Sequence, residues 1–157
     1  MKYILILLFC FTTLFSSSDY SQKKIKFTGK VKEEIKKRVS IANIEKLGLK
    51  EYEIIDPYTK KNTNYSGVDL KLFANFYGKE EVESIVFKAI DGYEVTITKN
   101  EWQKYNILLA TKLNNEYVSY DKKGPLRIIF PNYKLASENF AKNLPKWIWM
   151  INSIEFK

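Results

Sequence analysis

Residues 82–97, VESIVFKAIDGYEVTI, contain the clearest strand–turn–strand pattern in the chain. The first half, residues 82–89, is a β-prone apolar run, and residues 93–97 alternate apolar and polar side chains. Asp91-Gly92 lies between the two runs, and this dipeptide favours the tight turn of a β-hairpin. We therefore expect a hairpin here, with the remaining elements arranged around it.

The segments on either side of this hairpin contain more strand patterns than helix patterns. Ser40 and Asp69 are expected to cap short helices that end at Gly48 and Gly78. A helix over residues 69–78 would place Leu72, Phe73 and Phe76 at helical spacing. Further strands are expected at residues 25–28, 52–55, 107–113, 126–131 and 147–156, a turn or short helix at 100–105, a helical turn at 136–143, and a polar loop at 57–67.

These elements show no regular alternation of strand and helix. The pattern predicts an α+β fold with a mainly β mixed-sheet core and two or three short helices. Residues 19–157 suit a single domain, and a hydrophobic content of 45% is enough to build its core.

The first eighteen residues have the pattern of a secretory signal peptide. Lys2 precedes an apolar run over residues 4–15, and Ser16 and Ser18 provide small residues before a cleavage site. This run is shorter than the roughly 20 residues that span a bilayer. We expect an exported protein, periplasmic or secreted, with no membrane span after cleavage; a retained N-terminal anchor is the alternative. Attachment of lipid to Cys10 is disfavoured by the bulky Phe9 before it.

Composition excludes several kinds of active site. Cys10 is the only cysteine and lies within the signal, and the chain has no histidine. Thiolate and histidine metal sites, disulfides and Ser-His triads are therefore not expected in the mature chain, and no catalytic or metal-binding residue is assigned. The net charge of +8 marks a basic protein and favours anionic partners. Lysines are interspersed with glutamates, without the basic, aromatic-rich stripe that would predict nucleic-acid binding.

Several short segments, in their order along the chain, resemble a known family. These segments are TGKV at 28–31, SIANI at 40–44, YSGVDL at 65–70, DGY at 91–93, GPLRIIFP at 124–131, and Lys146-Trp147 followed by IEF at 154–156. Together they are similar to the molybdopterin-binding domain of sulfite-oxidase-type oxidoreductases, and most similar to its short, stand-alone, exported versions. The resemblance covers nearly the whole mature chain.

The departures from this family concern its cofactor. Redox-active members hold molybdenum through a cysteine placed shortly before the segment that matches residues 65–70. Residues 53–60 contain Asp56 but no cysteine, and a carboxylate is a poor substitute for a thiolate at a soft metal centre. The late pterin-binding loop has also changed, because residues 132–145 contain neither glycine nor arginine, although Lys146-Trp147 remains. The resemblance therefore implies the fold without the metal, and no cofactor is expected.

Five residues are candidates for binding a ligand: Asp91, Tyr93, Arg127, Lys146 and Trp147. Each also has a structural interpretation. The first two suit the hairpin turn alone, and Arg127 suits an ion pair with Asp91, Glu101 or Glu155. If residues 147–156 form one strand, Trp147 and Trp149 share one face of it, either in the core or at a partner site.

The resemblance leads to three functional hypotheses. The first is an exported module without molybdenum redox chemistry that binds a small anionic ligand or an envelope protein. The second is an oxidoreductase that still binds molybdopterin non-covalently through Arg127 and Lys146. The third is an accessory protein of envelope signalling or electron transfer. Whether the chain is an enzyme stays open at this level.

Overall fold

The computed structural model describes residues 20–134 and 137–157. The predicted signal peptide, including Cys10, lies outside the described residues. Within them, none of the helices combines the length and the apolar character that crossing a bilayer would require.

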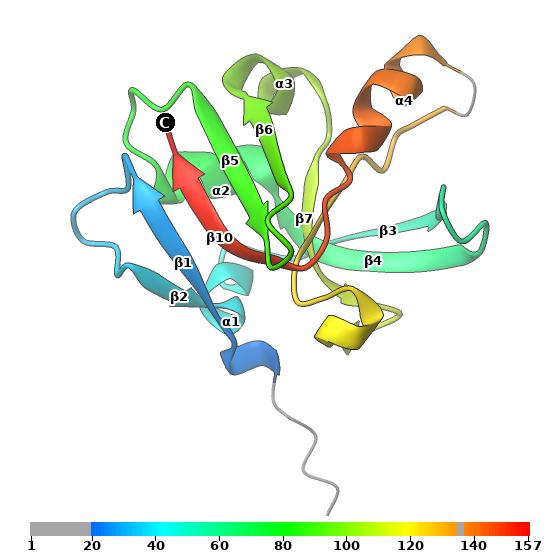
Figure 1. Ribbon diagram of the computed structural model, residues 1–157, viewed down its shortest axis with the longest axis horizontal. Coiled ribbons are helices and arrows are strands. Elements are labelled where there is room, and N and C mark those ends of the chain that lie inside the picture. Colours follow the sequence, from blue (N-terminus) through cyan, green and yellow to red (C-terminus); the bar gives the residue numbers. More distant parts are fainter. Residues whose placement is uncertain (1–19, 135–136) are drawn as a thin grey trace, which may run out of the picture.

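The first sheet contains the predicted hairpin. Its strand order is β2 (Arg38–Ser40), β1 (Lys24–Gly29), β10 (Ile151–Phe156), β5 (Ser84–Ala89) and β6 (Glu94–Thr98). β1 and β10 are parallel and the other neighbours are antiparallel, so the sheet is mixed. β5 and β6 pair from Ser84 with Thr98 to Lys88 with Glu94, which confirms the hairpin. In Figure 1 these long strands cross the front of the molecule.

The second sheet is antiparallel and includes a strand that the sequence did not predict. Its order is β3 (Lys50–Ile55), β4 (Asn62–Asp69), β7 (Leu108–Leu113) and β8 (Glu116–Tyr117), and β9 (Arg127–Ile129) also pairs with β7. The prediction of a loop at residues 57–67 was wrong from Asn62 onward. These residues form β4, which pairs with β3 on one side and β7 on the other. A Cβ on Gly67 would lie 2.2 Å from the Leu109 carbonyl oxygen, so this close pairing requires glycine.

The α-helices within the described residues are α1 (Ile41–Glu45), α2 (Leu70–Tyr77), α3 (Lys99–Lys104) and α4 (Glu138–Asn143). Three short 3₁₀ helices, η1 (Tyr20–Gln22), η2 (Tyr120–Lys122) and η3 (Leu144–Lys146), complete the described elements. The predicted caps of α1 and α2 are confirmed, since Ser40 accepts from the Asn43 amide at 3.3 Å and Asp69 from the Leu72 amide at 3.1 Å.

The predicted apolar face of α2 needs correction. The helix buries Leu70, Phe73, Ala74 and Tyr77, whereas Leu72 and Phe76 are exposed on its outer side. The sequence grouping combined residues from two faces, because positions 72 and 76 share one stripe and positions 70, 73, 74 and 77 share the other.

Aromatic rings fill the core between α2 and the first sheet. The Phe27 ring meets Phe73, Tyr77 and Phe156 edge-on, with ring centroids 5.0–5.7 Å apart. Phe27, Phe73 and Phe156 are each almost fully buried. The predicted α+β class with a mainly β mixed-sheet core is confirmed.

The last predicted strand begins later than expected. Residues 147–150 do not belong to β10, which starts at Ile151, and Met150 has a φ of 58°. The left-handed backbone conformation of Met150 changes the direction of the chain just before β10. Trp147 and Trp149 therefore lie in a connection after η3, and not on one face of a strand.

Candidate functional site

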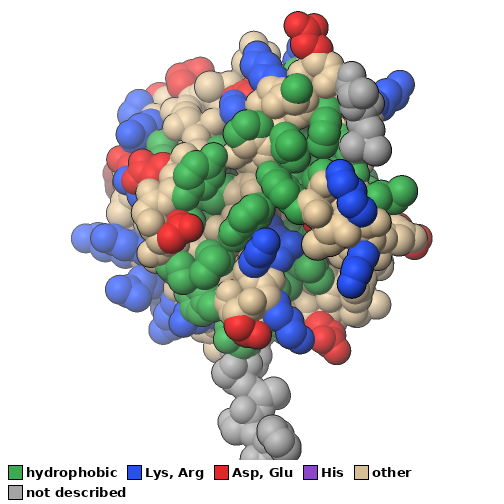
Figure 2. Space-filling view, turned by 45° about the vertical axis from the view of Figure 1, so that its right-hand side comes forward, with side chains coloured by type: hydrophobic (Ala, Val, Ile, Leu, Met, Phe, Trp, Pro, Cys, Tyr) green, Lys and Arg blue, Asp and Glu red, His purple; other side chains and the backbone are tan. Residues whose placement is uncertain are grey.

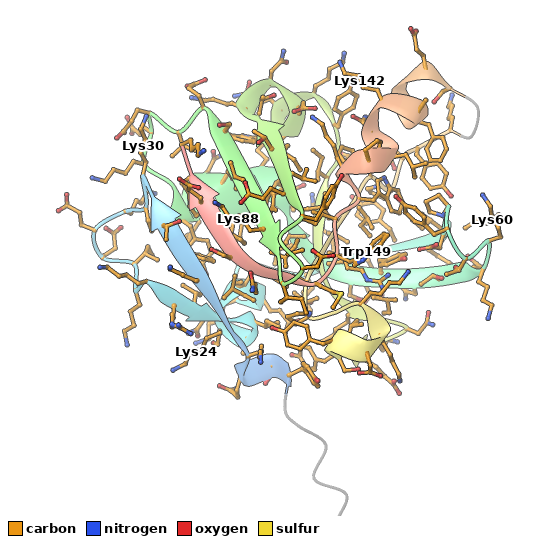
Figure 3. All side chains as sticks on the ribbon, viewed as in Figure 1. Lys24, Lys30, Lys60, Lys88, Lys142 and Trp149 are labelled. Atoms are coloured by element: carbon orange, nitrogen blue, oxygen red, sulfur yellow. The ribbon has the colours of Figure 1, made fainter. Side chains whose placement is uncertain are left out.

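Trp147 lies between two pockets in the part of the molecule where α4 and η3 approach the ends of both sheets. The first, here called the aromatic pocket, has a volume of about 310 Å³. The second, here called the hairpin pocket, has a volume of about 290 Å³. Trp147 contributes to the lining of both. Figure 3 labels the neighbouring Trp149, near the point where the chain enters β10.

Stacked and edge-on rings form one wall of the aromatic pocket. The Tyr133 ring stacks on Phe140 with centroids 5.0 Å apart, and it meets Trp147 edge-on at 5.5 Å. The Tyr133 hydroxyl donates a hydrogen bond to the Ile55 carbonyl at the end of β3, which holds the ring in place. Aromatic walls of this kind suit a flat, apolar ligand surface.

Among the residues that the structure describes, two buried polar atoms in the lining of the aromatic pocket have no hydrogen-bond partner. They are the indole Nε1 of Trp147 and the side-chain oxygen Oδ1 of Asn143. The two residues are only 4% and 5% exposed. A buried polar group without a partner costs about 1–3 kcal/mol, so native proteins rarely leave one unless water or a ligand completes it. The indole offers a donor and the amide oxygen an acceptor.

The hairpin pocket brings together three of the five predicted site residues, Asp91, Tyr93 and Trp147. Asp91 accepts a hydrogen bond from the Tyr93 amide at 3.0 Å, as expected for the turn. The Tyr93 hydroxyl donates to the Pro145 carbonyl at 2.8 Å, and the Tyr58 hydroxyl donates to the Leu144 carbonyl at 2.9 Å. Both tyrosines thus hold η3 in place while their rings remain exposed.

This part of the surface is unusually apolar. Exposed fractions are 55% for Ile55, 44% for Tyr58 and 49% for Tyr93. Figure 2 shows hydrophobic side chains gathered over the middle of one face, with lysine and arginine side chains among and around them. Lys123 lies over the Trp149 ring at 4.5 Å, and that ring meets Tyr58 edge-on at 5.2 Å.

Arg127 does not form any of the ion pairs predicted for it. Its Nε and Nη2 donate to the carbonyl oxygens of Lys123 and Lys122 at 3.1 and 2.8 Å, and its Nη1 lies 3.4 Å from the Tyr65 hydroxyl. The guanidinium therefore holds the turn before the cis Gly124-Pro125 bond, and three of its five N–H donors are used in doing so. The predicted ion pairs with Asp91, Glu101 and Glu155 are replaced by contacts with backbone carbonyl oxygens.

Asp56 is also fully engaged. Its Oδ1 accepts from the amides of Tyr58 and Thr59 at 2.8 and 2.7 Å, and its Oδ2 accepts from the Tyr65 hydroxyl. Burial alone would raise the pKa of Asp56, but these hydrogen bonds outweigh it and hold the pKa below its usual range. Burial and the adjacent carboxylate raise the pKa of Tyr65. The Asp56–Tyr65–Arg127 chain is thus a satisfied structural network.

Lys146 points away from both pockets and forms an ion pair with Glu101. Glu101 also accepts from the Thr98 amide at 2.9 Å and so completes the capping box of α3. Burial raises the pKa of Glu101, but the contacts with Lys146 and Thr98 bring it below its usual range. Of the five predicted site residues, Arg127 and Lys146 therefore line neither of these two pockets.

The residues present do not fit a molybdenum centre of the resembled kind. The sequence offers Asp56 near the expected cysteine position, and its two oxygens already accept three hydrogen bonds. A hard, saturated carboxylate cannot replace a thiolate. Across residues 20–134 and 137–157, no cluster of three or more His, Cys, Asp or Glu side chains could hold a metal ion.

Sequence reasoning missed three residues of the aromatic pocket, Tyr133, Phe140 and Asn143. All belong to the segment at 132–145, for which the sequence predicted a helical turn at 136–143 and a departure from the resembled family, but no pocket. The one usable signal was its two aromatic residues, whose spacing does not reveal which pocket they line.

Comparisons with known proteins support the fold only. No family model matches the chain, and no curated protein matches it in sequence. Among solved structures, it is similar to the sulfane dehydrogenase SoxCD from Paracoccus pantotrophus, with a TM-score of 0.59 and 11% identity. The match covers 87% of this chain but only 38% of that chain. The chain therefore shares its fold with part of that sulfane dehydrogenase.

Proposed function

We propose that the chain is an exported binding module that holds a small, neutral, planar ligand in the aromatic pocket and performs no molybdenum redox chemistry. The observation that most supports this proposal is that, among the described residues, Trp147 and Asn143 each have a buried polar atom without a hydrogen-bond partner. Both atoms have almost no accessible surface, so a ligand with acceptor and donor groups, such as an amide on a ring, would satisfy them by displacing neighbouring side chains of the pocket. Among the described residues that line the pocket, the only charged side chain is the exposed Lys134, so the lining lacks the group of cations that the anionic ligand expected from the net charge would need.

Export remains part of this proposal, supported by the apolar run at residues 4–15 and the small residues after it. Secretion of a reporter fused behind residues 1–19 tests it, and retention of the reporter in the cytoplasm would contradict it.

The binding experiment uses a small panel of neutral planar amides, namely nicotinamide, benzamide and uracil, with toluene as a ring without polar groups. Calorimetric titration of the full chain should give saturable binding of at least one amide and weaker binding of toluene. Trp147→Phe keeps a ring but removes the indole N–H, and it should weaken amide binding about tenfold, or about 1.4 kcal/mol. Trp149→Phe is the matched control and should leave the affinity unchanged. Equal affinities for both variants, or no binding by the whole panel, would contradict the proposal.

The alternative of non-covalent molybdopterin binding has less support from the structure than from the sequence. Its expected anchors, Arg127 and Lys146, already bind backbone carbonyls and Glu101 respectively. A distant structural likeness to a sulfane dehydrogenase subunit keeps the cofactor as an alternative. Cofactor analysis of protein purified from its native host would revive it if a pterin were recovered in stoichiometric amount.

A partner-binding role in the envelope has one favourable observation. Tyr58 and Tyr93 line the hairpin pocket and are 44% and 49% exposed, and exposed tyrosines are frequent in protein interfaces. If this surface binds a protein, Tyr58→Ser should abolish crosslinking to that partner while leaving amide binding in the aromatic pocket intact.

A further inference from the structure

A third pocket, of about 320 Å³, lies between β2, α1 and the end of α2 and shares no lining residue with the other two. Its walls include the apolar side chains of Ile35, Val39, Leu47, Phe76 and Tyr77. The Phe76 ring is 49% exposed. A large ring left in water at the mouth of an apolar pocket is unfavourable unless another apolar group covers it.

Three cations line the same pocket without a carboxylate partner. Lys36, Arg38 and Lys46 form no ion pair within 4 Å in the described part of the chain, and the only acidic residue lining the pocket is Glu34. This is a local excess of positive charge beside an apolar cavity.

Two neighbouring carboxylates are engaged elsewhere, and Glu34, the acidic residue in the lining, offsets only one of the three cations. Glu33 pairs with Lys79 at 3.4 Å, and Glu45 lies 3.6 Å from Lys112 while accepting hydrogen bonds from Thr111 and Tyr117. The charge at this pocket is therefore available to an external anion.

We infer that this pocket, here called the basic pocket, binds an anionic amphiphile with a single short acyl chain. Its apolar part would lie against Phe76 and Leu47, and its carboxylate would lie among Lys36, Arg38 and Lys46. Ligand pockets usually measure roughly 300–1,000 Å³, so a cavity of about 320 Å³ accommodates one chain and not a two-chain lipid. This site is independent of the proposed function, since Trp147 takes no part in it.

Calorimetric titration of the full chain with laurate, below its critical micelle concentration, tests the inference. Laurate should bind saturably with one molecule per chain, and the uncharged octyl glucoside should bind at least about tenfold more weakly. The triple variant Lys36→Gln/Arg38→Gln/Lys46→Gln should weaken laurate binding about tenfold, as expected when several favourable surface charge contacts of 0.2–1 kcal/mol are lost. The triple variant Lys60→Gln/Lys122→Gln/Lys142→Gln has the same net charge and should bind laurate normally.

Phe76→Ser provides a second variant that does not change the charge, and it should weaken laurate binding roughly fivefold to tenfold by removing apolar contact. Trp147→Phe should have no effect, so failure here and failure of the proposed function remain distinguishable. Equal laurate affinity in the two triple variants would overturn the inference, as would unsaturable binding. Binding to phosphatidylglycerol vesicles without binding of free laurate would assign the basic pocket to a membrane surface and would also overturn it.

Discussion

The rings around Phe27 and the rings around Trp147 are packed in different ways. Phe27, Phe73, Tyr77 and Phe156 contact one another directly and are each at most 3% exposed. The rings around Trp147 contact one another at similar distances, yet they surround cavities.

The two regions also differ in whether their polar side-chain atoms have hydrogen-bond partners. Among the described residues, Asn143 and Trp147 each keep an unpartnered polar atom, whereas the one polar side-chain atom of the Phe27 cluster, the Tyr77 hydroxyl, donates to the Asn43 carbonyl. Because unfilled space and unpaired polar groups both cost stability, the first region is built to hold the fold and the second to hold something else. The predictions below test this contrast.

Phe27→Ala should have the largest effect on stability. Removing a fully packed ring from between α2 and the first sheet should lower the free energy of unfolding by about 3–5 kcal/mol. Urea denaturation followed by circular dichroism measures it. A loss below about 1 kcal/mol would mean that this cluster is not the structural core.

Tyr65→Phe should come next, with a loss of about 1–3 kcal/mol in the free energy of unfolding at neutral pH. The substitution leaves the buried Asp56 carboxylate without one hydrogen bond and removes a contact of Arg127. Tyr52→Phe, on the strand next to Tyr65, is the matched control and should cost less.

The same variant carries a pH signature. The pKa of Asp56 in the folded protein lies below the ordinary value of 3.8, so its contribution to stability is present above about pH 4 and is lost as the pH falls through the folded pKa. Tyr65→Phe should reduce this acid-dependent loss, because it brings the folded pKa closer to the ordinary one. Urea titrations at pH 3 and pH 7 measure it, and an unchanged difference between the two pH values would contradict the assignment.

The sequence predicted elements that depend on neighbouring residues better than elements that depend on distant ones. Local signals sufficed for the β5–β6 hairpin and for the Ser40 and Asp69 caps, because turn and cap chemistry depends on neighbours in sequence. They failed for β4, whose polar residues become a strand only through pairing with β3 and β7. Tertiary pairing overrode local propensity there.

The site was predictable only in part for a related reason. Of the residues named as ligand-binding candidates, Asp91 and Trp147 were found to line one pocket, the hairpin pocket. Arg127 and Lys146 were not, because their partners, two backbone carbonyls and Glu101, depend on how distant segments meet. The Met150 turn likewise has no strong local signal.

Asn143→Leu should separate stability from binding. Replacing a buried, partly unpaired amide with an apolar side chain of similar size should change the free energy of unfolding by less than about 1 kcal/mol, or raise it. Amide binding should nevertheless be lost from the aromatic pocket. Thermal unfolding and calorimetry on the same sample measure both, and a strongly destabilised variant would indicate that Asn143 is a structural residue.

Phe76→Ser should have the smallest effect on stability, within about 0.5 kcal/mol, because the ring lies on the exposed side of α2. Phe73→Ser, one turn away on the buried side, should cost several kcal/mol by comparison. Similar losses for the two variants would contradict the orientation of α2.

The most direct test of the central claim, that the region around Trp147 is a binding site, is nuclear magnetic resonance of the tryptophan indole groups. Trp102, Trp147 and Trp149 are the only three tryptophans, so each indole N–H signal can be assigned by substitution. Titration with the neutral planar amides should move the Trp147 signal saturably, in the direction of a new hydrogen bond, while the Trp102 signal stays in place. An unmoved Trp147 signal across the whole panel, or equal shifts of all three signals, would contradict the account.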